Sequence, residues 1–368
     1  MKQMGQRIFC SFIRKPRQQS GLVAIIVLWV LVILTILVLG LARKTNVELT
    51  LTKHALSKSK AKYIAWAGVL SAIDLIRRDS KDTKSSQQDT LYYCGRPVDD
   101  HASPQTLFEG EQFAKGSFEI SYPQMIDETG EPKIVLGFQD EERRININTL
   151  EMNNINVLIE LLTLLEVDSN NAYTIAYSLL DWKDADKQVN NDTYGAEDEF
   201  YQSLEQGYKT KNLPFDSLAE LKLVRGITDE IYQKIEKYLT VYPKTGRFRI
   251  NYDTADKAVI SAVARAFSGA VTNTEITDAD ALVEKILTYR KGADGIEASE
   301  DDQVVESGGM PLNAKESVIW LAMNQYRTRR SDFFKVLVKG KEHDRQAQST
   351  IEAVIDRTGY AIVGWHLH

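Results

Sequence analysis

The sequence predicts an α+β fold with one long N-terminal helix, strands on both sides of the middle region, and a large all-α segment inserted between those strands. Three observations support this: a long apolar run near the N-terminus, strand patterns on both sides of the middle region, and helical patterns within it. A chain of 368 residues with 43% apolar residues has enough material to build such a packed core.

The N-terminal region predicts a membrane anchor. Residues 22–42 read LVAIIVLWVLVILTILVLGLA and carry no charge. As a helix they extend about 31 Å, close to the hydrocarbon thickness of a bilayer. Residues 1–21 carry five cations and no acid, so the positive-inside rule places them in the cytoplasm and the bulk of the chain across the membrane. The alternatives are an ordinary signal anchor and a cleaved secretory peptide, but the latter has its small residues after the apolar run, and here Gly21 precedes it.

We expect this helix to continue beyond the membrane as an amphipathic helix. Apolar side chains recur at spacings of three, four or their multiples, which predicts that they form its apolar face. These residues are Val47, Leu51, Ala55, Trp66, Leu70 and Ile73. The polar stretch KDTKSSQQDT then predicts a loop.

Strand patterns bracket the middle of the chain. Residues 116–122 (GSFEISY) alternate apolar and polar side chains, residues 133–138 (KIVLGF) are rich in β-formers, and three more strands are expected near the C-terminus. Strands at both ends need partners, so we interpret the middle as an insertion; three consecutive domains are the alternative. The expected segments are a basic leader (1–21), a membrane helix (22–42), the first part of the α/β core (43–147), the helical insertion (148–330) and C-terminal strands that complete the sheet (331–368).

The insertion contains a weak repeat and a helix–hairpin–helix pattern. The stretches that begin at Arg143 and Arg247 share an Ile-Asn step and then a threonine, Thr149 or Thr254, which we expect to cap the following helix. Residues 213–243 predict a helix, a turn and a second helix. Hairpins of this kind can bind the DNA backbone, but the turn GITDE is acidic, which favours a structural role.

Composition and motifs exclude several classes of protein. Two cysteines, Cys10 and Cys94, provide neither a disulfide framework nor a thiolate zinc site. The sequence has no Gly-rich phosphate loop and no HExxH, CxxC or GxSxG motif, so we do not expect an enzyme. Residues 1–21 carry +5 against a net charge of −6, which leaves −11 on the remainder and disfavours a nucleic-acid partner.

One acidic segment is a candidate metal site. Residues 179–201 read LLDWKDADKQVNNDTYGAEDEFY, and hard oxygen ligands at this density suit Ca²⁺ better than a transition metal. The frame is not that of an EF-hand, because Val189 and Gly195 fall at the sixth and twelfth positions counted from Asp184. A solvated acidic loop is the alternative. The interleaved aromatic residues instead predict a folded loop, in which the carboxylates repel one another unless protons or a cation neutralise them.

These segments together resemble the minor pseudopilin K family of type II secretion, also called general secretion pathway protein K. The pieces that carry the resemblance are SGLVAIIVLWVL, ININT, LLDWKDAD followed by GAEDEFY, and PFDSLAELKLVRGITDEIYQKI. The leader resembles those of type IV pilins and pseudopilins more generally. It implies that a prepilin peptidase cuts after Gly21 and that the new amine of Leu22 is methylated. The usual Glu is replaced by Ile26, which suits a subunit with no other subunit ahead of it in the filament.

The resemblance also implies a pseudopilin fold with a helical insertion, in which the long N-terminal helix packs on an antiparallel sheet. It implies a single pass through the bacterial inner membrane, a periplasmic globular part and a place at the pseudopilus tip. The implied partners are the minor pseudopilins I and J and the major pseudopilin, and a secreted protein is a further candidate. The resemblance implies calcium in the insertion, carried over to Asp184, Asp186, Glu197, Asp198 and Asp181. Asp181 could instead cap the preceding helix.

Two other functions remain possible on the sequence. A membrane-tethered DNA-uptake protein of the competence type would use the hairpin to bind duplex DNA. A minor subunit of a type IV pilus would have the same kind of leader.

Overall fold

The computed structural model describes residues 20–81, 108–113, 115–125, 132–269, 273–295 and 302–368. The leader up to residue 19 and Cys94 lie outside the described residues. The chain divides into two units, residues 1–57 and residues 58–368, and each is described by itself.

The first unit contains the beginning of helix α1 (Ser20–Lys81). Within the part of the chain that the structure describes, this is the one helix that is long and apolar enough to cross a membrane. The single polar side chain of the apolar run, Thr35, donates its hydroxyl hydrogen to the carbonyl oxygen of Val32 (2.8 Å). The helix therefore satisfies its own polar groups, as a helix in hydrocarbon must.

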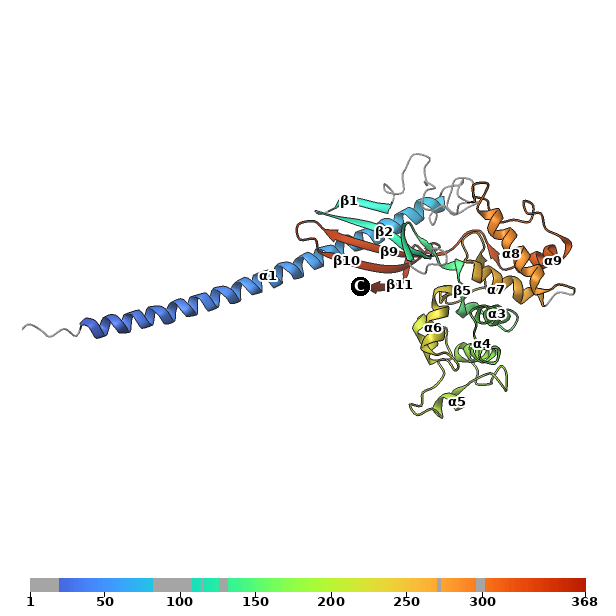
Figure 1. The fold of residues 1–368 in the computed structure, drawn as a ribbon, viewed down its shortest axis with the longest axis horizontal. Coiled ribbons are helices and arrows are strands. Elements are labelled where there is room, and N and C mark those ends of the chain that lie inside the picture. Colours follow the sequence, from blue (N-terminus) through green and yellow to red (C-terminus); the bar gives the residue numbers. More distant parts are fainter. Residues whose placement is uncertain (1–19, 82–107, 114, 126–131, 270–272, 296–301) are drawn as a thin grey trace, which may run out of the picture. The chain divides into compact units, whose positions relative to one another are not determined.

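An antiparallel sheet forms the core of the second unit. Its main strand order is β1–β2–β9–β10–β11, with β3 paired to β2 and β4 paired to β9 (Figure 1). The strands are β1 (Glu109–Phe113), β2 (Gly116–Met125), β3 (Pro132–Leu136), β4 (Gln139–Asp140), β9 (Phe333–Glu342), β10 (Gln348–Asp356) and β11 (Ala361–Leu367). In register, Ile120 lies opposite Val338, and Val338 lies opposite Ile351. Strands from both ends of the sequence thus share one sheet, and the predicted α+β class is confirmed.

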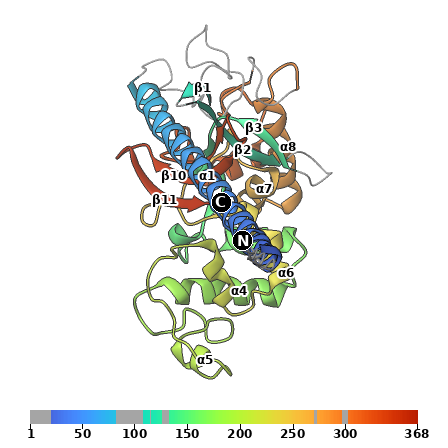
Figure 2. The same cartoon turned by 90° about the vertical axis from the view of Figure 1, so that its left-hand side faces the viewer.

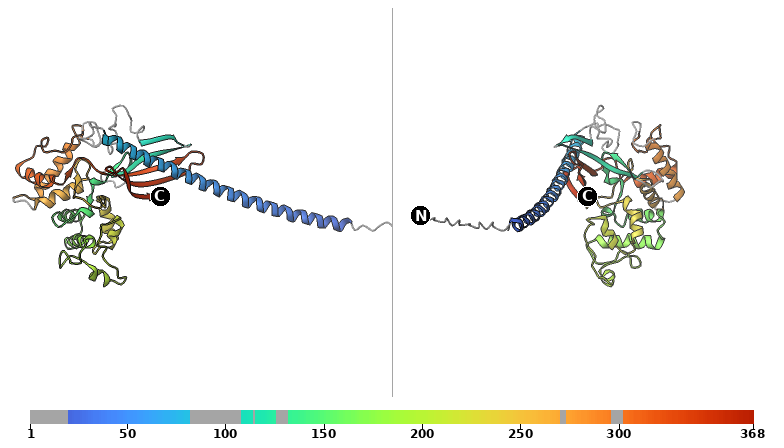
Figure 3. Two further views of the ribbon diagram at one scale, coloured as in Figure 1. Left: turned by 180° about the vertical axis from the view of Figure 1, so that it is seen from behind. Right: turned by 60° about the vertical axis from the view of Figure 1, so that its left-hand side comes forward.

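The last part of α1, from residue 58 on, packs along one face of this sheet (Figures 2 and 3). The predicted apolar face of this part is wrong at two of its three residues: Trp66 and Leu70 are exposed, whereas Ile73 is partly buried against the core of the sheet. The buried residues are Ala61, Ile64, Ala65, Val69, Ala72, Leu75 and Ile76. The reason is close approach, because small side chains let the helix backbone touch the strand. At Gly340 a Cβ atom would collide with the backbone of Ala61 and Ala65.

Between the strands β4 and β9 the chain builds a largely helical insertion with its own apolar core. Helix α7 is central, since it packs on α3 and on α8 and α9. The α-helices are α3 (Asn156–Leu164), α4 (Ser169–Lys183), α5 (Asp198–Gln202), α6 (Asp229–Ile235), α7 (Lys257–Ser268), α8 (Ile276–Arg290) and α9 (Ala314–Asn324). Four short segments are 3-10 helices: η2 (Glu141–Arg143), η3 (Ile147–Thr149), η4 (Leu218–Leu223) and η5 (Glu236–Tyr238).

The predicted helix–hairpin–helix is present in part. Its second half is α6, but its first half is the 3-10 helix η4 rather than an α-helix. A capping box of Ser217 and Glu220 starts η4, and the turn contains Gly226 at φ +89°. Glycine is favoured there because the left-handed region costs it little.

The weak repeat corresponds to two similar pieces of structure. Each Ile-Asn step forms a short strand in a parallel pair: β5 (Ile145–Asn146) with β6 (Leu239–Thr240), and β7 (Ile250–Asn251) with β8 (Arg327–Thr328). The expectation that the threonines cap the next helices is wrong. Thr149 and Thr254 each donate to the carbonyl oxygen of the asparagine three residues earlier, and Asp256 caps α7.

An ion-pair cluster links the two connections between sheet and insertion. Arg249 Nη2 lies 2.7 Å from Glu142 Oε1 on the outgoing connection and 2.8 Å from Asp332 Oδ2 on the returning one. Burial, reinforced by the charge of Asp140, raises the pKa of Glu142 to about 8.

Candidate metal centre

The ends of two helices bring the acidic residues together. Asp184 is the C-terminal cap of α4, and Glu197 is the N-terminal cap of α5. The loop between them folds back so that one ligand atom from each of Asp184, Asp186 and Glu197 lies within 4.8 Å of the others. The group ranges from the exposed Asp186 to the buried Glu197. Three hard carboxylate oxygens at this spacing can hold a divalent cation.

The burial of these carboxylates is not fully compensated. Asp184 Oδ1 and Glu197 Oε1 are buried and accept no hydrogen bond from the residues that the structure describes. Burial raises the pKa of Asp184 to about 6 and that of Glu197 to about 7. A protein without a cation at this place therefore favours protonation of these groups, and a cation would reverse that preference.

Asp181, the first predicted ligand in chain order, has a different environment. Its Oδ1 accepts from the backbone N and the side-chain Nδ2 of Asn190 (both 2.8 Å), and its Oδ2 accepts from the backbone N of Ala196 (2.7 Å). Its side chain is fully buried, and Gly195 leaves room for it because a Cβ atom there would collide with Oδ2. Asp181 thus ties the middle and the far end of the loop to α4.

Asp198, the remaining predicted ligand, lies next to the group of three. Its Oδ1 accepts from the backbone N (3.0 Å) and the hydroxyl (2.8 Å) of Thr210, and Lys187 Nζ lies 3.9 Å from its Oδ2. The same hydroxyl lies 3.2 Å from Glu197 Oε2. No pattern in the sequence points to Thr210, because it lies nine residues beyond the end of the acidic segment and contacts it only after the chain folds.

Aromatic packing keeps the loop folded, as the interleaved aromatic residues predict. Tyr194 stacks on Tyr173 and Tyr177 of α4, with ring centroids 5.4 and 6.2 Å apart. Trp182 meets Tyr201 of α5 edge to face at 5.2 Å. These contacts fix the loop against both helices.

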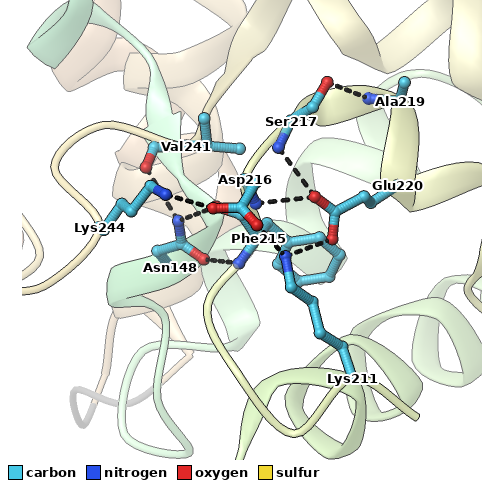
Figure 4. Close-up of polar contacts among 9 residues, drawn as sticks. All are labelled: Asn148, Lys211, Phe215, Asp216, Ser217, Ala219, Glu220, Val241 and Lys244. Atoms are coloured by element: carbon cyan, nitrogen blue, oxygen red, sulfur yellow. Dashed lines mark hydrogen bonds and ion pairs between the residues drawn. The ribbon is translucent and has the colours of Figure 1, made fainter. Parts of the chain in front are cut away.

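Lysine and asparagine side chains connect the site to the rest of the insertion. Lys183, directly before Asp184, donates to the carbonyl oxygens of Asn148 (2.9 Å) and Leu150 (2.5 Å), and burial lowers its pKa to about 8. The Asn148 side chain accepts from the backbone N of Phe215 (2.7 Å) and donates to the carbonyl oxygen of Val241 (2.8 Å) (Figure 4). The ININT stretch therefore supports the α4 end of the site.

Next to this network, Asp216 pairs with Lys211 and Lys244, and Lys211 also pairs with Glu220 (Figure 4). These ion pairs fix the chain at the start of η4, where it enters the hairpin. On its other side, Lys222 pairs with Asp229 across the turn (2.8 Å).

The positions expected for processing lie at the start of α1. Gly21 and Leu22 are in its first turn, and Ile26 follows one turn later with an exposed side chain.

In three comparisons with known proteins, the proteins that match are components of type II secretion systems. A family model for "Type II secretion system (T2SS), protein K" matches residues 143–244. The type II secretion system protein K of Pseudomonas aeruginosa is 23% identical and covers 77% of this chain and 76% of its own length. That of Pectobacterium carotovorum is 24% identical, covering 82% and 83%. A crystal structure of the GspK-GspI-GspJ complex from enterotoxigenic Escherichia coli contains a chain that matches with a TM-score of 0.53 and 16% identity, covering 88% of this chain and 99% of that one.

The chain has a pseudopilin fold. Its N-terminal helix is apolar enough to cross a membrane, the later turns of that helix pack on an antiparallel sheet, and a helical insertion interrupts the sheet. The matched segment contains the ININT stretch, the acidic loop and the hairpin. Over this segment the chain matches the type II secretion system protein K family, which confirms the resemblance seen in the sequence.

Proposed function

We propose that this minor pseudopilin occupies the tip of the pseudopilus, where it starts or limits filament assembly for the export of folded proteins. The observation that carries the proposal is the insertion: seven α-helices of the described residues lie between β4 and β9. A helical filament repeats one contact indefinitely, and a bulky insertion obstructs the next copy. Such a subunit is tolerated where no subunit follows.

Two further observations support a tip position. Ile26 leaves the membrane helix without the carboxylate that would pair with the amine of a subunit ahead, and an unpaired carboxylate in hydrocarbon is costly. The solved structure with the same fold contains GspK together with GspI and GspJ. The partners proposed here are accordingly the minor pseudopilins I and J, then the major pseudopilin, with the globular part in the periplasm and the helix in the inner membrane.

Co-purification tests the partner assignment. When all pseudopilins of the system are expressed together, the detergent-solubilised full chain should retain I and J in about equal amounts. Purification with the major pseudopilin alone would contradict the proposal.

We also propose that Asp184, Asp186 and Glu197 hold a Ca²⁺ ion. Support comes from the donor set and from the two buried oxygens that accept no hydrogen bond within the described part of the chain. Bound calcium would supply the positive charge that offsets repulsion among the carboxylates. Asp181 and the aromatic stack hold the loop, and the caps of α4 and α5 hold the ligands.

The DNA-uptake alternative is not favoured. The turn of the hairpin carries Asp229, and the nearby cation Lys222 is already paired with it. Another nearby cation, Arg225, donates to the carbonyl oxygen of Gly195 and lies over the ring of Phe200. Little positive charge is left for a phosphate.

A further inference from the structure

A third buried oxygen near the acidic loop accepts no hydrogen bond from the described residues. It is the side-chain Oδ1 of Asn212, and the other two are Asp184 Oδ1 and Glu197 Oε1. A buried acceptor without a donor costs free energy, because it loses its hydrogen bonds to water and gains none. Three such acceptors on neighbouring segments indicate one shared electropositive partner.

The contacts of Asn212 place it beside the ligand segment. Its backbone N donates to the carbonyl oxygen of Trp182 (3.0 Å), and its Nδ2 donates to the carbonyl oxygen of Asp186 (3.2 Å). Two residues earlier, Thr210 bonds Glu197 and Asp198. The segment 210–212 therefore lies along both ends of the acidic loop.

The backbone of Asn212 has an uncommon conformation. Its φ is +50°, in the left-handed region that residues other than glycine rarely adopt. Asparagine tolerates this region better than most residues, and the conformation is retained although the turn gains no hydrogen bond to Oδ1 from the part of the chain described. A ligand role for that oxygen would account for the choice of residue.

We propose that Asn212 is a further ligand of the cation, through its side-chain carbonyl oxygen. The proposal rests on the calcium site proposed above and extends it beyond the acidic loop. Ca²⁺ takes six to eight oxygen ligands, amide carbonyls among them, whereas Mg²⁺ demands near-ideal octahedral geometry and keeps several waters. A neutral amide oxygen completes the shell without adding repulsion to the three carboxylates. The residue would thereby favour Ca²⁺ over Mg²⁺.

Terbium luminescence on the full chain in detergent micelles tests this inference. Tb³⁺ is a hard ion that replaces Ca²⁺ at oxygen sites, and Trp182 lies close enough in sequence and space to sensitise it. Comparing emission lifetimes in H₂O and D₂O counts the water molecules on the bound ion. The Asn212→Gly variant removes the carboxamide and suits the left-handed backbone. We expect it to gain one bound water and to lose Ca²⁺ affinity by on the order of tenfold.

Two other variants make the result specific. Asn212→Asp keeps an oxygen at the same place, so the water count should stay at the original value. Asn273→Gly makes the same chemical change at another asparagine of positive φ (+67°), outside the loop, and should alter neither count nor affinity.

An unchanged water count and affinity in Asn212→Gly would overturn the ligand role of Asn212 while leaving the calcium site intact. Absence of both sensitised emission and Ca²⁺ binding in the original chain would overturn the calcium site and this inference together. A loss of affinity in Asn212→Gly without the extra water would indicate a supporting role only and would also contradict the proposal.

Discussion

At the scale of single residues, the acidic segment separates into two kinds of carboxylate. Asp184, Asp186 and Glu197 form a group in which one buried oxygen of Asp184 and one of Glu197 accept no hydrogen bond from the described residues, whereas Asp181 accepts from three donors. The sequence predicts the cluster from its density of acids. The sequence does not show that Asp181 differs from the other three acids, because the difference depends on the N–H groups of Asn190 and Ala196, which reach Asp181 only in the folded chain.

The metal site gives a residue-scale prediction. Calcium should raise the melting temperature of the full chain in detergent, because an ion that binds only the folded state stabilises it by about 2.7 kcal/mol at a hundredfold excess over its Kd. Asp186→Asn should abolish this response. Asp192→Asn, which changes an exposed acid of the same loop outside the group, should retain it. Equal melting temperatures in calcium and in chelator for the original chain would make the cluster a solvated acidic loop.

Glu142 gives a second residue-scale prediction, which concerns the dependence of stability on pH. Its pKa of about 8 in the folded protein exceeds its ordinary value of 4.5, so between these values the folded state holds a proton that the unfolded state releases. The contribution of Glu142 to the free energy of unfolding therefore falls as the pH rises from about 5 to about 8. Asp140, Arg249 and Asp332 are the charged groups that face it.

Glu142→Gln keeps an acceptor for Arg249 and removes this titration. Denaturant melts between pH 5 and pH 9 should show a shallower loss of stability in Glu142→Gln than in the original chain. The exposed Glu205→Gln serves as the control. Parallel pH profiles for all three proteins would show that Glu142 is charged throughout.

At the scale of elements, the sequence predicts the strands well and the helix–sheet packing poorly. Alternation in residues 116–122 and in the C-terminal segments corresponds to β2, β9, β10 and β11. The predicted face of α1 is wrong at Trp66 and Leu70, because the largest apolar side chains suggest the core, while close approach to β9 selects alanine and glycine. The spacing of apolar residues does not predict two local features. These are the 3-10 geometry of η4 and the capping of α7 by Asp256 rather than by Thr254.

This packing yields an element-scale prediction. Gly340→Ala would push a methyl group into the backbone of α1 at Ala61 and Ala65, and overpacking of this kind typically costs about 1–3 kcal/mol. Gly269→Ala adds the same methyl group where nothing lies within 4 Å of it. Thermal melts should show a lower melting temperature for Gly340→Ala alone. If both variants melt like the original, α1 does not approach β9 as closely as described.

The N-terminus gives a second element-scale prediction. A basic leader meets the uncharged helix at Gly21, so in cells with a prepilin peptidase the mature chain should begin at a methylated Leu22. Mass analysis of the N-terminal peptide from membrane-purified protein measures this directly. An uncut chain, or a cut beyond Ala42, would contradict assignment as a processed pseudopilin subunit.

At the scale of the whole molecule, the tip proposal assigns opposite effects on filament growth to the N-terminal helix and to the insertion. In the proposed function, the apolar N-terminal helix would bring the subunit into the filament, and the insertion would obstruct further addition. Calcium bound between α4 and α5 would keep the insertion folded in the periplasm. These properties together suit a subunit at the end of an assembly.

The central claim, a position at the tip, is tested most directly by locating the chain on assembled filaments. Pseudopili produced by a strain that carries an epitope tag in this chain, placed at the exposed Asp294, would be imaged with gold-labelled antibody. The account predicts label at one end of each filament, with none along the shaft. Label repeated along the shaft would contradict it.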